Sequence, residues 1–247
     1  MIRLVYILVT VLLTLCQCVF AQQKTTVESF DKVMISPHIQ VSFVEGNEES
    51  VTILEQKVTD DKINIKASNG KLRVYLDGAK ETTKQVKVKE NGVKVKRPLY
   101  RGKQLSILVT YKTLNEISVR GEEAARFESR IKAEDFQVTI YGESDVVFED
   151  VKIQNFDLDI IGNSEFKIIK GKVDYLNVKV IGEAVVYLDD VKNRKSKLKA
   201  VGEAEFRVNT SELVKFSAVG EAELYYKGNP EIDKGLSIGE ARIHKIQ

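Results

Sequence analysis

The stretch that decides the fold is Val180–Leu188, which reads VIGEAVVYL. Its pattern is an apolar residue, a glycine, an acidic or polar residue, a small residue and then alternating apolar positions. The pattern recurs around seven glycines, namely Gly121, Gly142, Gly162, Gly182, Gly202, Gly220 and Gly239. Successive glycines lie 18 to 21 residues apart. A fixed period near 20 is typical of a solenoid, in which each repeat is one coil stacked on the last.

Apolar residues alternate with polar ones on both sides of each glycine, as at Val178 and Val180 before Gly182 and at Val186 and Leu188 after it. A period of two indicates strands, so each coil is predicted to have a strand that ends at the glycine, a sharp corner and a second strand. Glycine suits the corner because it adopts positive φ without strain. The prediction is an all-β parallel β-helix with coils of about 20 residues, regular over residues 114–247, in which the seven glycines are structural corners.

Basic and acidic side chains nearly cancel, with 38 Lys and Arg against 36 Asp and Glu among 247 residues. Such a chain has no global electrostatic field that attracts nucleic acid, so nucleic-acid binding is not expected. Hydrophobic residues make up 43% of the chain, which fits one folded domain, predicted to span residues 30–247.

The first 21 residues have the pattern of a secretory signal peptide. Arg3 gives a positive start, residues 4–15 form an apolar run, and Val19 and Ala21 provide the small residues of a cleavage site after Ala21. The run is too short to span a bilayer, and no other run could. Cleavage would remove both cysteines, so the chain exported to the periplasm, outer surface or medium is expected to lack disulfides and thiolate metal sites. Residues 22–29 are predicted to be a flexible leader.

Residues 30–79 show short alternating runs between turn residues, which predicts β-structure less regular than the repeats. Residues 80–103 differ because they are strongly basic and contain VKVKENGVKVK at 86–96. Asn-Gly between two alternating runs predicts a two-stranded hairpin, inserted here into the solenoid. Its candidate polyanion-binding residues are Lys87, Lys89, Lys94, Lys96 and Arg97. The alternative is that these lysines only discourage pairing of a strand edge.

The signal segment, the opening Phe30-Asp31-Lys32-Val33 and the tandem repeats together resemble a bacterial family, the head GIN domain of putative auto-transporter adhesins. The resemblance covers about residues 30–228. The family's corners usually read Gly-Ser-Gly or Gly-Asn-Ala, whereas most corners here read Gly-Glu-Ala. The resemblance implies an exported, right-handed parallel β-helix and offers no catalytic residues to carry over.

An acidic stripe accompanies the corners, one and three residues after the glycines. Its candidate interaction residues are Glu143, Asp145, Glu165, Glu183, Glu203, Glu205, Glu221 and Glu223. Carboxylates on coils that stack roughly 4.7–4.9 Å apart repel one another, so a cation or a cationic partner is one interpretation. The other is a solvated ridge neutralised by Lys167, Lys179, Lys199 and Arg207. The glycine-rich nonapeptides of calcium-binding β-rolls are absent from the sequence, and no metal site is predicted.

Catalytic patterns are missing from the sequence. His38 and His244 are expected to be surface side chains, and no nucleophile elbow, phosphate loop or zinc-binding helix motif occurs. Asp157 and Asp159, with Lys179 one coil on, come nearest to the paired carboxylates of a β-helix enzyme that acts on acidic polysaccharides.

The sequence therefore predicts an exported cell-envelope or surface module for binding or adhesion, without catalytic activity, cofactor or metal. Its expected partner is a ligand outside the cytoplasm, such as a glycan or another envelope component. The alternatives are a polysaccharide-active enzyme and a purely structural envelope protein. The oligomeric state is left open.

Overall fold

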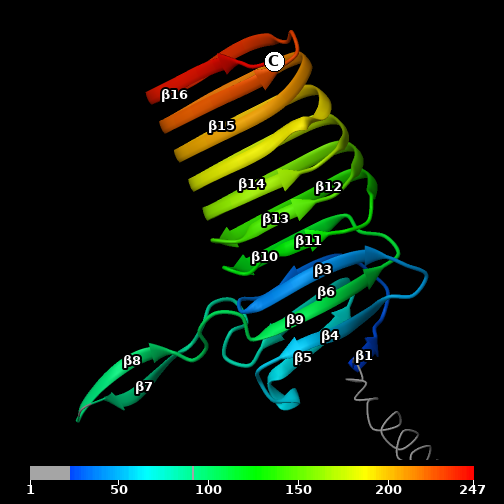
Figure 1. Ribbon diagram of the computed structural model, residues 1–247, viewed down its shortest axis with the longest axis vertical. Helices are drawn as coiled ribbons and strands as arrows, with labels where there is room; N and C mark the ends of the chain where they lie inside the picture. Colours follow the sequence, from blue (N-terminus) through cyan, green and yellow to red (C-terminus); the bar gives the residue numbers. More distant parts are fainter. Residues whose placement is uncertain (1–22, 91) are drawn as a thin grey trace, which may run out of the picture.

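The computed structural model describes residues 23–90 and 92–247, and the predicted signal segment at 1–21 lies outside them. The described chain is a β-solenoid whose coils stack along one axis, with a two-stranded arm projecting near the N-terminal end (Figure 1). Its one helical element is a 3-10 turn, η1, at Asp60–Lys62. Among the residues described, no helix has the length and apolar character needed to cross a membrane.

Nine strands form the arm and the N-terminal end of the stack. They are β1 (Gln23–Thr26), β2 (Phe30–Ile35), β3 (Ile39–Glu45), β4 (Ser50–Gln56), β5 (Ile63–Ser68), β6 (Gly70–Leu76), β7 (Gln85–Glu90), β8 (Val93–Pro98) and β9 (Leu105–Tyr111). The repeats follow as β10 (Glu116–Gly121), β11 (Ala125–Phe127), β12 (Ile131–Gly142), β13 (Asp145–Phe148), β14 (Val151–Ile168), β15 (Gly171–Lys227) and β16 (Glu231–Lys245). The two longest, β14 and β15, run through corners without a break in strand geometry.

The repeats stack in register, glycine on glycine. Gly121 pairs with Gly142, Gly142 with Gly162 and Gly162 with Gly182, all between parallel strands. Gly220 pairs with the glycine of the last coil in the same way. Parallel pairing therefore satisfies the backbone of each coil through its neighbours, as a solenoid requires.

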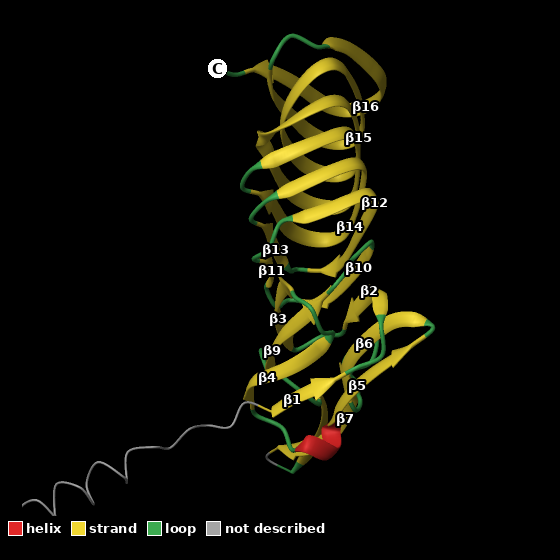
Figure 2. Cartoon of the chain, turned by 90° about the vertical axis from the view of Figure 1, so that its right-hand side faces the viewer, coloured by secondary structure: helices red, strands yellow, loops and turns green. Residues whose placement is uncertain are grey.

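The coils at the N-terminal end do not stack in chain order. Strand β2 pairs in parallel with both β6 and β10, and β3 pairs in parallel with both β9 and β11. The β2–β3 coil therefore lies between the β6–β9 coil and the first repeat. Antiparallel strands close this end, because β5 covers β6, β4 covers β9 and β1 covers β4 (Figure 2). The sheet at this end then terminates in the short strands β1 and β5, and short edge strands discourage open-ended pairing with other chains.

The prediction of a flexible leader over residues 22–29 is wrong where the structure describes it. Strand β1 pairs antiparallel with Ser50–Ile53, and the hydroxyl of Ser29 donates a 2.9 Å hydrogen bond to Glu49. The edge of β4 offers unpaired backbone groups that a polar segment such as Gln23–Thr26 can satisfy. Alternation of polar and apolar residues does not reveal a strand of this kind.

The corners explain the requirement for glycine. The seven corner glycines have φ between +100° and +135°, a region that side chains rarely adopt. Space is equally limiting, because a Cβ on Gly182 would lie 2.3 Å from the carbonyl oxygen of Gly162. From Gly142 to Gly239 each corner thus holds the carbonyl of the preceding coil where a side chain would stand, whereas at Gly121 the Cα of Pro37 takes that place.

The interior is a column of stacked apolar side chains. Phe127 lies between Phe43 and Phe148, with ring centroids 4.4 and 3.9 Å apart. Where two sides of a coil converge behind a corner, only small side chains fit, and Ala184 and Ala222 are buried there. Layers of this kind bury apolar surface without any need for disulfides.

A polar cluster interrupts this apolar column. The side-chain oxygen of Asn193 accepts hydrogen bonds from the hydroxyls of Ser196 and Thr210, each at 2.7 Å, and all three residues are buried. The two hydroxyls are also 2.7 Å apart. The cluster lies where the glycine period shortens from 20 to 18 residues. Hydrogen bonding offsets the desolvation of the three side-chain oxygens, whereas the Nδ2 of Asn193 is buried without a partner among the described residues.

Candidate interaction surfaces: an acidic face and a basic arm

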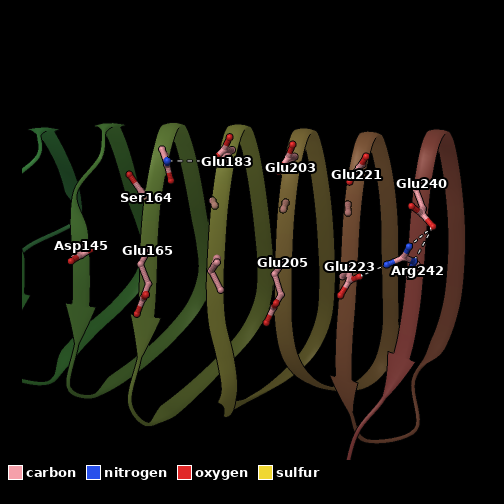
Figure 3. Close-up of a pocket in the computed structure, with 15 residues that line it drawn as sticks. Asp145, Ser164, Glu165, Glu183, Glu203, Glu205, Glu221, Glu223, Glu240 and Arg242 are labelled. Carbon is pink, nitrogen blue, oxygen red and sulfur yellow. Dashed lines mark hydrogen bonds and ion pairs between the residues drawn. The ribbon is translucent and has the colours of Figure 1, made fainter.

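The acidic stripe forms two parallel rows on one side of the solenoid, which we call the acidic face. The first row stands directly after the corners and includes Glu183, Glu203, Glu221 and Glu240, all exposed (Figure 3). The second row stands two residues further on, at Asp145, Glu165, Glu205 and Glu223. Buried alanines lie between the rows and form the floor of a shallow trough of about 540 Å³. The trough is open to solvent.

Among the described residues, the direct cationic contacts of the acidic face lie toward its C-terminal end. The guanidinium of Arg242 bridges the rows, 2.9 Å from Glu223 and 2.6 Å from Glu240. The hydroxyl of Tyr225 also donates a 2.6 Å hydrogen bond to Glu223. This hydrogen bond, followed by the contact with Arg242, lowers the pKa of the Glu223 carboxyl. Arg207 pairs with Glu205 at 2.6 Å.

Further along the face the carboxylates lack cationic partners. Among the residues described, no Lys or Arg nitrogen lies within 4.0 Å of Glu143, Asp145, Glu165, Glu203 or Glu221. Of the four residues expected to neutralise the ridge, Arg207 pairs with Glu205, whereas Lys167, Lys179 and Lys199 form no ion pair within 4.0 Å in the described part of the chain. Within the same residues, no group of three His, Cys, Asp or Glu side chains is placed to hold a metal ion.

An exposed aliphatic row runs beside the acidic face, on the residue just before each corner glycine. Its members are Ile161, Ile181, Val201, Val219 and Ile238, which are between 37% and 58% exposed. Outward apolar residues at five successive coils form one continuous line, and such lines are typical of interaction sites. The sequence carries the signal for this row, because the same position is aliphatic in five repeats and is out of phase with the inward residues two and four places before the glycine.

The basic arm is a separate two-stranded sheet made by β7 and β8. Its register places Lys87 opposite Lys96 and Lys89 opposite Lys94, so one face carries four lysines. Like charges directly opposite each other destabilise a hairpin, and no carboxylate of the described residues lies within 4.0 Å of these lysines. Arg97 pairs with Val86 and so belongs to the other face of the arm, apart from the four lysines with which it was grouped.

The arm leaves the solenoid at a corner. It connects β6 to β9, which are the two sides of one coil, and thus occupies the position that a glycine holds in the repeats. His38 contacts both ends of the arm where the arm meets the solenoid. Its Nδ1 lies 2.9 Å from the carbonyl oxygen of Gly102, and its Nε2 accepts a 2.6 Å hydrogen bond from the hydroxyl of Thr83. The backbone N–H of His38 donates to Glu123 at 2.8 Å.

The expectation that His38 is a surface side chain is wrong, because its side chain is only 13% exposed. Its φ of +73° makes it the positive-φ residue of the β2–β3 corner, one residue after Pro37, which the register places opposite Gly121. The sequence signal for this junction is Glu123, a carboxylate at the corner position that is small in the later repeats. His244 is exposed and stacks on Tyr225, with ring centroids 4.9 Å apart.

The carboxylates considered for polysaccharide cleavage, Asp157 and Asp159, have different neighbours in the next coil. The amide of Asn177 donates to Asp157 at 2.7 Å, and Asp159 stands opposite Lys179 in the next coil. Each carboxylate is therefore matched to a different neighbour along the flat side of the solenoid.

Comparison with solved structures supports the fold. The chain is similar to a putative adhesin from Bacteroides fragilis NCTC 9343, with a TM-score of 0.75, 16% identity, and coverage of 91% of this chain and 96% of that one. It is also similar to a putative adhesin from Parabacteroides merdae ATCC 43184 (TM-score 0.66, 14% identity, 92% and 96% coverage). A putative lipid binding protein from Parabacteroides distasonis ATCC 8503 gives a TM-score of 0.66 at 18% identity, with 92% and 96% coverage.

A comparison with curated proteins finds no match. A family model does match, over residues 29–230, which is most of the chain. Together with the stacked coils, this match shows that the chain belongs to the family described as putative auto-transporter adhesin, head GIN domain.

Proposed function

We propose that this protein is an exported binding or adhesion module of the cell envelope or surface. It engages its ligand on open surfaces of the solenoid and performs no catalysis. The observation that carries the proposal is the set of like charges that the backbone register holds side by side on the acidic face and on the arm. Repulsion within such pairs destabilises the folded chain, and a bound ligand of opposite charge offsets this repulsion.

The shape of the surfaces supports binding to an extended partner. The acidic trough and the aliphatic row beside it both run along successive coils, so contacts repeat at the coil spacing of roughly 4.8 Å. A partner that combines basic and apolar groups matches this side, and a polyanion matches the four lysines of the arm. The description of the family as adhesins agrees with a binding role.

A glycan array probed with the intact protein tests the proposal, together with pull-down from envelope fractions. The expected result is saturable binding that falls when residues 84–97 are deleted or when Glu203 and Glu221 are changed to Gln. Absence of any saturable ligand in both assays would contradict a binding role and favour a purely structural one. New reducing or unsaturated ends on a bound acidic polysaccharide would instead show an enzyme.

A further inference from the structure

Positive charge is concentrated in one segment of the chain. Residues 57–103 contain 14 Lys and Arg against 5 Asp and Glu, although the whole chain is nearly neutral. The arm accounts for only part of this excess. The remainder includes Lys66, Lys71, Arg73 and Lys80, on or next to the hairpin of β5 and β6 that closes the solenoid.

The register gathers these cations on the outer face of the hairpin. Leu72 and Val74 of β6 are buried in the core, so the residues that alternate with them, Lys71 and Arg73, face outward. Lys66 of β5 stands directly opposite Arg73. Across the other edge of β6, Lys32 of β2 stands opposite Lys71. Two like-charge pairs thus lie on adjacent strand pairs, an arrangement that stability alone does not favour.

Tyr75 is the centre of the cluster. The Nζ atoms of Lys66 and Lys80 lie 5.6 and 5.4 Å from its ring centroid, and the guanidinium carbon of Arg73 lies at 5.6 Å. The ring attracts these cations and so holds them together despite their mutual repulsion.

The cluster is only partly neutralised by the protein itself. Arg73 pairs with Glu81 and Lys32 pairs with Glu116, whereas Lys66, Lys71 and Lys80 have no carboxylate within 4.0 Å among the described residues. The cluster can therefore accept further negative charge.

The same side chains line an open depression of about 610 Å³, which also includes the polar groups of Ser68 and Asn69. We propose that this depression, the Tyr75 basin, binds an acidic polysaccharide through its carboxylate or sulfate groups, with the neutral side chains receiving sugar hydroxyls. Lysine and arginine donors bind such anions by charge-assisted hydrogen bonds. The inference rests on the proposed binding function and names the ligand class for a site separate from the arm.

Two other anionic partners fit the basin less well. Nucleic acid binding uses free aromatic faces on which bases stack, but cations already surround the Tyr75 ring. A membrane surface calls for exposed large apolar side chains beside the cations, and none of the residues that line the basin is of that kind.

The test compares three variants that remove the same charge. The basin variant is Lys66→Gln, Lys71→Gln and Lys80→Gln, and the arm variant is Lys87→Gln, Lys89→Gln and Lys94→Gln. The control removes exposed lysines from a remote side of the coils, with Lys132→Gln, Lys152→Gln and Lys192→Gln. The probes are a size-defined heparin oligosaccharide, uncharged dextran and anionic phospholipid vesicles, measured by titration calorimetry and by sedimentation of the vesicles. Thermal melting confirms that each variant is folded.

We expect the basin variant to raise the Kd for the heparin oligosaccharide by roughly tenfold or more, and the control by less than about twofold. Dextran should not bind. A basin variant that behaves like the control would overturn the inference, even where the arm variant loses affinity and so upholds the proposed function. Loss of vesicle binding alone would also overturn it in favour of a lipid surface. Failure of the wild type to bind any acidic polysaccharide would refute the inference about the Tyr75 basin. The proposed function would still be tested separately by the glycan array and the pull-down.

Discussion

Replacing Gly182 with alanine tests the corner in its simplest form. Two separate costs follow from the structure. The φ of +118° forces a side-chain-bearing residue into a strained region, which costs about 1–3 kcal/mol. The new Cβ would also stand 2.3 Å from the carbonyl oxygen of Gly162, a backbone atom that cannot move aside as a side chain can. The two coils must separate locally, and each weakened hydrogen bond between them costs about 1 kcal/mol.

The expected loss for Gly182→Ala is therefore above about 3 kcal/mol. Gly102→Ala is a matched control, because Gly102 also has a positive φ, +56°, but has no atom within 4 Å of a Cβ built on it. We expect the control to lose only about 1–2 kcal/mol, the cost of the left-handed conformation.

Urea unfolding followed by far-UV circular dichroism measures both variants, and it suits a chain that has no tryptophan. Equal losses for Gly182→Ala and Gly102→Ala would refute the role assigned to the carbonyl contact. A neutral effect of Gly182→Ala would refute the corner geometry itself.

Three further predictions concern other parts of the structure. Glu49, which is buried and 2.9 Å from Lys112, has a lowered pKa because of this contact. The contribution of Glu49 to stability is therefore complete above its pKa in the unfolded chain and is lost as the pH falls through its pKa in the folded chain. Glu49→Gln should lower the Tm at pH 7, and the difference in Tm from the wild type should shrink as the pH falls below about 4.5. Asn193→Ala should cost about 2 kcal/mol in urea unfolding because it leaves two buried hydroxyls without their acceptor, whereas Lys192→Ala at the exposed neighbouring position should cost less than about 0.5 kcal/mol. Millimolar calcium should shift the Tm in a thermal melt by less than about 1 °C, and a larger rise would show a metal site on the acidic face.

The repeats are the part of the fold that the sequence predicts best. A coil must return to the same angular position each turn, so the residue at the corner, the small residue behind it and the alternating apolar residues recur at fixed offsets. Gly162 and Gly182 show the rule, since each packs against the carbonyl of the glycine before it. The all-β solenoid and the family followed from this pattern.

The N-terminal end was predictable only as β-structure. Its strands are recognisable one by one, but the insertion of the β2–β3 coil between two later segments is a matter of long-range pairing, which leaves no local pattern. The corner of that coil has Pro37 where the repeats have glycine and takes its positive φ at His38. The pairing of Gln23–Thr26 depends on an edge that exists only after folding.

The candidate surfaces were predicted in part. The positions of the carboxylate rows follow from the repeat itself. Their neutralisation does not, because Arg242 reaches two carboxylates through a long side chain whose direction depends on its surroundings. The Tyr75 basin draws its cations from β2, β5, β6 and the segment after β6, so only the pairing of distant strands brings them together.

The position of the β2–β3 coil has a consequence for how the chain acquires its structure. During synthesis the N-terminal residues emerge first, yet this coil needs β6 and β9 on one side and β10 and β11 on the other. Its second neighbour is complete only when Phe127 has been made. The β2–β3 coil therefore gains its first stacked neighbour only when β6 and β9 have been made, far along the chain, whereas each later coil can add to the coil made just before it. A chaperone that shields strand edges would therefore act mainly on the N-terminal half of the chain.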